Sequence, residues 1–202
     1  MVSASYSPSL VFISLCVAIL ASYTALDLAG RIATARGRTV YLWMSGGALA
    51  MGFGVWSMHF IGMLALQLPL ELGYDLGLTV WSLLVAILSS GFALWLVSQP
   101  RLPALQLLFG ALVMGAGISA MHYSGMAALR MQPGIDYDPA LVGLSLVIAV
   151  GASAAALSIA FRLRKHTPYV HLVRAGASII MGVAIVGMHY TGMAAANFPV
   201  GS

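Results

Sequence analysis

Charged residues are scarce in this chain. Only 7% of its 202 residues are charged, with nine Lys and Arg against five Asp and Glu, whereas 61% are apolar. A soluble globular domain has about 25% charged and roughly 45–50% apolar residues. The composition therefore excludes an ordinary soluble domain and predicts a membrane protein.

Cysteine and catalytic motifs are also nearly absent. Cys16 is the only cysteine, so no disulfide forms within the chain and the redox compartment is left open. The sequence has no paired nucleophile and base, no phosphate loop and no dinucleotide fingerprint, and the stretch GASAAAL at 151–157 predicts helix packing. We therefore expect no enzymatic catalysis within this chain.

Long runs with few or no charges fill most of the sequence. They cover 8–30 (with Asp27 alone), 39–70, 76–100, 102–129, 139–161 and 175–202. Each exceeds the roughly 20 residues that a spanning helix needs. Because a backbone in lipid must satisfy its own hydrogen bonds, runs of this length indicate helices. The prediction is an all-α membrane protein with six transmembrane helices in contact with lipid.

Basic residues gather in alternate loops. The first, third and fifth loops hold eight of the nine: Arg31, Arg36, Arg38, Arg101, Arg162, Arg164, Lys165 and Arg174. Basic loops face the cytoplasm, which predicts that the N-terminus and residue 202 lie on the outer side of the membrane. Since this rule accounts for the net charge of +4, no nucleic-acid partner is expected. The N-terminus has no basic segment, so the first helix is expected to be retained rather than cleaved.

One pattern, Met-His-x-x-Gly-Met, occurs three times. It reads MHFIGM at 58–63, MHYSGM at 121–126 and MHYTGM at 188–193. A Met-Gly pair precedes each copy, at 51–52, 114–115 and 181–182, and weaker echoes stand at 24–28, 92–96 and 155–159. The repeating unit is thus a helix hairpin, used at about 8–67, 76–130 and 139–197. We expect one domain over 1–202 with three hairpins in a pseudo-threefold arrangement.

The motif lies near the outer end of the second helix of each hairpin. At 1.5 Å per residue, the imidazoles lie about 10 Å below the outer surface. The glycine seven residues before each histidine falls on nearly the same helix face, where small residues let helices approach closely. All three histidines are therefore expected to lie at one depth and to converge.

The residue types of the motif favour a metal site. A lone buried His or Met is often only a packing partner, but ionisable residues in a membrane are costly, and three at one depth indicate a function. Imidazole with thioether favours copper, and thioether favours Cu(I) in particular. Zinc gains little from methionine, and Mg²⁺, Ca²⁺ and Mn²⁺ prefer the carboxylates that the motif lacks.

The predicted ligands are His59, His122 and His189, with Met63, Met126 and Met193 one turn outward; Met58, Met121 and Met188 point elsewhere and are weaker candidates. Tyr123 and Tyr190 follow two of the histidines, but Phe60 holds that position in the first copy. A tyrosine therefore cannot be an obligatory ligand in all three repeats.

Other functions of the three histidines remain as alternatives. A copper or proton carrier or channel needs polar residues below the histidines, whereas the motif helices carry Gly, Ala and aliphatic residues there. Asp27 is the only other ionisable residue in the apolar runs, and it is expected to pair with Arg31 four residues on. Haem ligation by His and Met suits a threefold arrangement poorly, and bound zinc is a further alternative.

The three motif copies resemble the bacterial MHYT integral-membrane sensor domain. The third copy contains MHYT in full at 188–191; Phe60 and Ile61 depart in the first copy, and Ser124 departs in the second. The resemblance covers essentially the whole chain. It implies a sensory input module of the bacterial inner membrane, with the N-terminus and residue 202 on the periplasmic side. Such a module is proposed to bind copper and through it to sense O₂, CO or NO.

Membership of that family also implies a covalently linked cytoplasmic output. Such outputs are commonly diguanylate cyclase and cyclic-di-GMP phosphodiesterase domains, and in other members a histidine kinase or a DNA-binding module. We therefore expect a further crossing and an output domain beyond residue 202, which would carry any enzymatic activity. A homodimer is left open, because no sequence feature decides it.

Overall fold

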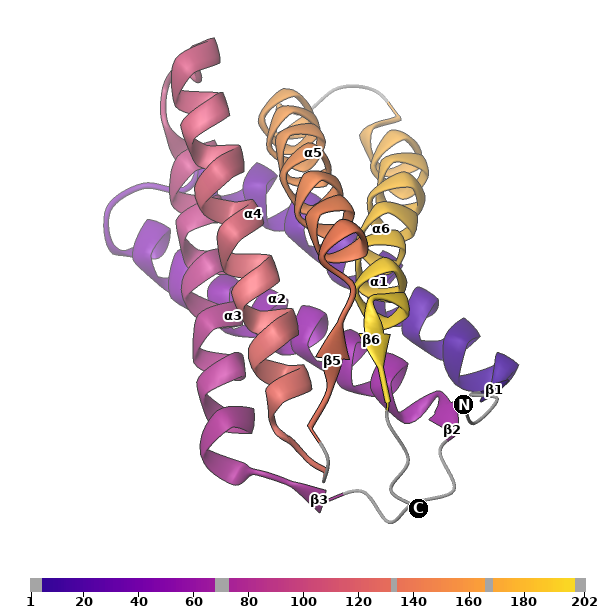
Figure 1. The fold of residues 1–202 in the computed structure, drawn as a ribbon. Helices are drawn as coiled ribbons and strands as arrows, with labels where there is room; N and C mark the ends of the chain where they lie inside the picture. The colour runs from indigo at the N-terminus through magenta and orange to yellow at the C-terminus, as the bar shows by residue number, and fades with distance from the viewer. Residues whose placement is uncertain (1–4, 68–72, 132–133, 166–168, 199–202) are drawn as a thin grey trace.

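Six long helices make up the computed structural model, which describes residues 5–67, 73–131, 134–165 and 169–198 (Figure 1). They are α1 (Pro8–Thr34), α2 (Arg38–Leu64), α3 (Leu76–Ser98), α4 (Ala104–Ala127), α5 (Pro139–Leu163) and α6 (Val170–Ala194). All six are long and apolar enough to cross a membrane. The predicted fold class is therefore confirmed, while the predicted position of residue 202 lies outside the described residues.

The helices form a closed ring. Each packs against the next in the chain, and α6 packs against α1 (Figure 1). Every helix turns large apolar side chains outward, each more than 60% exposed, for example Phe12, Leu42, Leu88, Phe109, Val147 and Ile180. An apolar exterior around an interior of small residues is typical of helices that face lipid. The chain is a multi-pass membrane protein.

Three short β-ribbons close the hairpins at one end of the ring. β1 (Ser5–Tyr6) pairs with β2 (Leu66–Gln67), β3 (Gly73–Tyr74) with β4 (Leu129–Arg130), and β5 (Asp136–Tyr137) with β6 (Ala196–Asn197). Each ribbon joins the start and the end of one hairpin (Figure 1). We term this the ribbon end and the opposite end, where the paired helices connect, the loop end.

A hydrogen bond beside each ribbon repeats in all three hairpins. The N–H groups of Ser7, Asp75 and Asp138 donate to the carbonyls of Ala65, Ala128 and Ala195 at 2.7–2.8 Å. These carbonyls lie at helix C-termini, where the backbone has no partner within its own helix. The chain is thus built from three repeated hairpins, and the pseudo-threefold axis itself stays a prediction.

The first helix of each hairpin carries a column of small residues. The pattern Ser-x₃-Ala-x₃-Ser-x₃-Leu runs over 14–26, 82–94 and 145–157, and all twelve of these side chains are buried. The second helix of each hairpin has a glycine at the matching position, and a Cβ added there would lie 3.0 Å or less from a backbone atom of a neighbouring helix. The pairs are Gly52 with Ile87, Gly115 with Val150, and Gly182 with Ile19. The expected close approach at these glycines is therefore present.

The loop end contains a buried arginine. Arg174, expected in a loop, lies inside α6 and is 1% exposed. Its Nη1 donates to Asp27 at 3.1 Å and its Nη2 donates to the carbonyl of Leu163 at 3.1 Å. Asp27 also accepts from Arg31 at 2.6 Å, the expected pair. A buried charge is tolerated when it is paired, so α6 begins earlier than the charge pattern predicted.

Candidate metal centre

Three imidazoles meet inside the ring of helices. His59, His122 and His189 each lie five residues before the end of α2, α4 and α6, and each is 1% exposed. Their candidate ligand nitrogens all lie within 4.8 Å of one another. Nδ1 of His59 is 3.1 Å from Nδ1 of His189, and the ring centroids are 4.9–5.2 Å apart. The expected convergence is confirmed, and ligation itself stays a prediction.

The motif glycine makes this convergence possible. A Cβ at each motif glycine would overlap Nε2 of a histidine from another hairpin. The pairs are Gly62 with His189, Gly125 with His59, and Gly192 with His122. Each imidazole therefore lies against the bare backbone of another motif helix, and the contacts run in a cycle around the ring. This cycle explains why glycine stands three residues after histidine in every copy.

The nitrogens of the cluster fit a metal ion. Each Nε2 lies against a motif glycine of another helix, which leaves the three Nδ1 atoms as candidates for a shared ion. Nδ1 of His59 faces Nδ1 of His189. Among the described residues, Nδ1 of His122 is buried without a hydrogen-bond partner, which costs free energy unless a ligand satisfies it. Three nitrogens about 2.0 Å from one ion in a trigonal plane lie about 3.5 Å apart. The observed separations, 3.1 Å for one pair and at most 4.8 Å, bracket that value. Small ring movements would complete the site.

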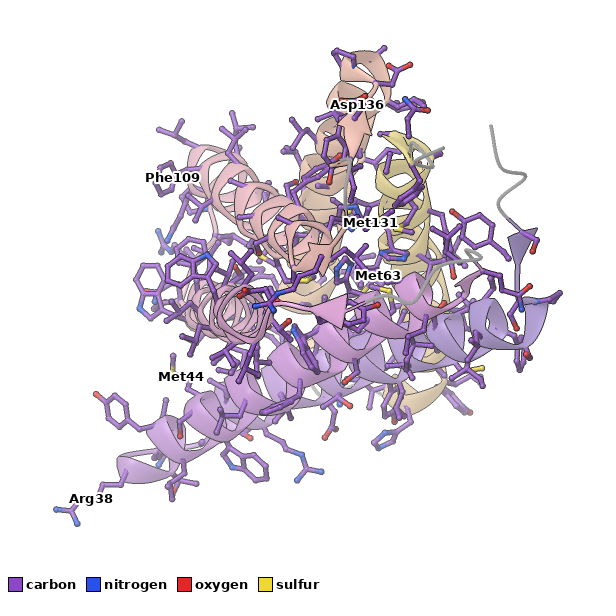
Figure 2. The ribbon with its side chains drawn as sticks, turned by 60° about the horizontal axis from the view of Figure 1, so that its bottom comes forward. Arg38, Met44, Met63, Phe109, Met131 and Asp136 are labelled. Carbon is purple, nitrogen blue, oxygen red and sulfur yellow. The ribbon has the colours of Figure 1, made fainter. Side chains whose placement is uncertain are left out.

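A layer of methionine covers the histidines on the ribbon side. Met63, Met126 and Met193 are at most 3% exposed and share one apolar cluster with Leu66 and Ala196. Figure 2 looks toward the ribbon end and shows Met63 among the helix ends, whereas Phe109 points away from the bundle. These three methionines lie one turn outward from the histidines, as predicted. That their sulfurs bind the ion stays a prediction.

The other three methionines of the motif have different surroundings. Met58, Met121 and Met188 are buried at 2–3% exposure but lie outside that cluster. Met121 lines a cavity on the loop side of the histidines. They stay weaker candidate ligands.

The motif tyrosines bind serines of adjacent hairpins. The hydroxyl of Tyr123 lies 2.7 Å from Oγ of Ser145, and that of Tyr190 lies 3.2 Å from Oγ of Ser14. Each serine also donates to the carbonyl three residues earlier in its own helix, so the tyrosine is the donor. These bonds connect α4 to α5 and α6 to α1.

A tryptophan replaces the missing tyrosine in the first copy. Phe60 has no hydroxyl, but Nε1 of Trp56, one turn earlier, donates to Oγ of Ser82 at 3.0 Å. α2 is thereby connected to α3 in the same manner. The sequence reasoning missed these serines, although the period of the Ser-x₃-Ala-x₃-Ser column would have revealed them.

Aromatic side chains from the ribbons cover the site. Tyr6 packs on Tyr190, Tyr74 on Phe60 and Tyr137 on Tyr123, with ring centroids 5.6–5.7 Å apart. Burial raises the pKa of the ribbon tyrosines. Their hydroxyls therefore stay neutral at physiological pH and place no charge over the histidines.

Comparison with known families identifies the repeat. The profile described as "Bacterial signalling protein N terminal repeat", MHYT, matches residues 52–110, 115–172 and 182–202. The three matches begin at Gly52, Gly115 and Gly182, each seven residues before a motif histidine. The matches therefore follow the spacing of the histidines. No solved structure matches the chain.

Curated relatives share the same region. The chain is 66% identical, over its whole length, to the bifunctional diguanylate cyclase/cyclic di-GMP phosphodiesterase MucR of Pseudomonas aeruginosa and spans 30% of that protein. It is 42% identical over 95% of its length to the cyclic di-GMP phosphodiesterase NbdA of the same organism, and 38% identical over 96% to the signaling protein YkoW of Bacillus subtilis, spanning 24% of each. With three profile matches along the ring of helices, the chain belongs to the MHYT family of bacterial signalling-protein N-terminal repeats.

Proposed function

We propose that this domain is a membrane sensor whose three motif histidines hold one copper ion. The observation that carries the proposal is the convergence of three buried imidazoles whose candidate ligand nitrogens lie within 4.8 Å of one another. Met63, Met126 and Met193 cover the ion on the ribbon side, where thioether sulfur favours Cu(I) over harder ions.

Charge supports Cu(I) over a divalent ion. The cluster consists of neutral ligands and contains no carboxylate. Nothing in the ligand set neutralises the ion, and the cost of burying a charge in a low-dielectric interior rises steeply with that charge. A monovalent ion is therefore favoured over Zn²⁺. Haem is disfavoured because the imidazoles contact one another directly, with centroids 4.9–5.2 Å apart, and leave no room for a porphyrin plane between them.

The core at the loop end favours a sensor over a carrier or channel. Leu26, Leu96 and Leu157, each at most 2% exposed, meet in one apolar cluster that lies toward the loop end. An ion or proton moving from the histidines to the loop end would have to cross this layer without polar partners. The domain therefore holds its ion rather than conducting it.

The signal follows from the chemistry of the ion. A Cu(I) ion held by the three histidines would supply a binding position for a diatomic ligand such as O₂, CO or NO. The buried side chains around the histidines exclude water from that position. When a gas molecule binds there, the contacts between the hairpins change. Each motif helix carries a Tyr or Trp bond to the next hairpin within three residues of its histidine. A shift of one ring therefore changes the contact between two hairpins, and a ligand shifts the population by its differential affinity for the two states.

The proposed output lies in the cytoplasm. The ribbon end faces the periplasm and the loop end, which carries most of the basic residues, faces the cytoplasm of the inner membrane. By analogy with MucR and NbdA, named for cyclic di-GMP turnover, the full-length protein regulates cyclic di-GMP through a linked domain.

Infrared spectroscopy under CO tests the proposal. The purified domain is reconstituted anaerobically with Cu(I) and exposed to CO, and a single carbonyl stretch that shifts with ¹³CO is expected. A His122→Ala variant should lose the band, whereas His171→Ala, which changes a histidine bonded to Tyr23 at the loop end, should keep it. Absence of the band in copper-loaded parent protein would refute gas binding, and failure to load copper would refute the metal site.

A further inference from the structure

A partly open cavity lies on the loop side of the histidines. Its volume is about 100 Å³, and it is lined by residues from all six helices. Val55, Ile118 and Ile185, each four residues before a motif histidine, are among its lining residues. Because its lining comes from equivalent positions of the three hairpins, the cavity lies along the centre of the ring. We term it the axial chamber.

Two of the four serines that line the axial chamber have a buried hydroxyl without a partner among the described residues. Ser22 and Ser153 line it at 3% and 1% exposure, and neither Oγ has a hydrogen-bond partner in the described structure. Ser82 and Ser178 instead donate to the carbonyl three residues earlier, whereas Ser119, outside the chamber, also has no partner in the part of the chain that the structure describes. A buried hydroxyl without a partner costs free energy, and at Ser22 and Ser153 the adjoining chamber has room for a molecule that would supply one.

The lining selects a neutral guest of small size. Among the residues that the structure describes, no charged or ionisable side chain lines the chamber, so a cation or anion there would be buried without a counter-charge. One water needs about 10–15 Å³ of such volume, and a chamber of about 100 Å³ therefore holds several waters or one molecule of a few heavy atoms. Alanine, methionine, valine and isoleucine side chains line most of the remainder, beside Ser89, Ser90 and Gly117, and suit an apolar portion of the guest.

We propose that the axial chamber is a binding site for small neutral hydrogen-bonding molecules. It holds a cluster of ordered water and admits a short alcohol or similar solute in exchange. Ser22 and Ser153 turn their buried hydroxyls toward the guest to bond it, and Val55, Ile118 and Ile185 line the chamber one helical turn before the motif histidines. This proposal is independent of the identity of the ion.

The direction in which the Tm changes when Ser22 or Ser153 is replaced by alanine tests whether a molecule occupies the chamber. If water bonds the hydroxyls, Ser22→Ala and Ser153→Ala each lose hydrogen bonds, and the Tm should fall by roughly 2–4 °C per substitution. If the chamber is dry, each substitution removes an unpartnered polar group, and the Tm should rise, which would overturn the proposal. Ser158→Ala in α5, whose hydroxyl bonds its own helix, gives the baseline for exchanging serine for alanine.

Thiol chemistry tests the same proposal in the folded protein. In a Cys16→Ala background, Ser153→Cys is treated with methyl methanethiosulfonate, a small neutral reagent, and its modification is followed by mass spectrometry. Ala149→Cys is the control, because Ala149 is buried one turn away in α5 but does not line the chamber. Since a thiol must ionise in water to react, modification should be at least tenfold faster at 153. Equal rates would overturn the proposal, and neither result depends on bound metal.

Discussion

Nδ1 of His59 lies 3.1 Å from Nδ1 of His189, across 130 residues of sequence. The first and last hairpins therefore meet directly at the candidate metal centre. Of these two nitrogens, one must donate and the other accept when no ion is bound, whereas both lone pairs must face an ion when one is present. Metal binding would thus replace a hydrogen bond between hairpins with shared coordination.

Enlarging a motif glycine should disrupt the centre. A Cβ at Gly192 would overlap Nε2 of His122, whereas a Cβ at Gly187, in the same helix, meets nothing within 4 Å. We expect Gly192→Ala to destabilise the domain by about 1–3 kcal/mol, the usual cost of overpacking, and to lower metal content. Gly187→Ala should leave both unchanged. Equal metal loss in the two variants would show that the imidazole does not lie against Gly192.

The two arginines bound to Asp27 should differ in importance. Arg174 is 1% exposed and Arg31 is 52% exposed, and both bind the same carboxylate. Asp27→Asn leaves the buried guanidinium without its counter-charge and should destabilise the domain by about 3 kcal/mol. Arg31→Ala should cost less than about 1 kcal/mol, as exposed pairs do. Thermal unfolding in detergent measures both, and similar losses would contradict the burial of Arg174.

The motif tyrosines should affect stability and not metal content. Tyr123→Phe removes the hydroxyl that donates to Ser145 at 2.7 Å, a loss of about 1 kcal/mol. Metal stoichiometry should be unchanged because that hydroxyl points to α5. If Tyr123→Phe abolished metal binding while the fold persisted, the tyrosine would have to be a ligand and the assigned geometry would be wrong.

Acid should remove one stabilising contact at the ribbon end. Asp75 accepts from Arg130 at 2.9 Å and from the N–H of Leu78, and these bonds lower the pKa of its carboxyl. A lowered pKa stabilises the fold above the unfolded value of about 3.9, and the stabilisation is lost as the pH falls through the lowered value. The Tm difference between the parent and Asp75→Asn should be constant from about pH 7 to 5 and shrink below about 4. A difference that persists at pH 2 would point to packing instead.

The convergence of the histidines was predictable because three signals agreed. Hydropathy gave the six helices, the period of the motif gave the hairpins, and the glycines at 52, 115 and 182 marked the faces that pack. A duplicated unit places equivalent residues at equivalent depth, so one motif sufficed to locate all three imidazoles. The family profile matches that period.

Other features escaped prediction for physical reasons. The sequence predicted Arg174 in a loop because a charged residue beside an apolar run usually ends a helix. Its partner Asp27 is 147 residues away, so no local sequence pattern indicates that the two residues pair. The ribbons comprise two residues per strand, too short for an alternating pattern. From the motif helices alone, we predicted only Gly, Ala and aliphatic residues on the loop side of the histidines. The prediction missed Ser22 and Ser153, because they lie in α1 and α5, the first helices of their hairpins.

Metal content of the purified domain tests the central claim most directly. The domain is expressed with copper and zinc both supplied, purified without chelator, and measured by elemental analysis beside the triple variant His59→Ala/His122→Ala/His189→Ala and the control His171→Ala. We predict close to one copper per chain in the parent and the control, and none in the folded triple variant. Zinc in place of copper, or copper retained without the three histidines, would contradict the account.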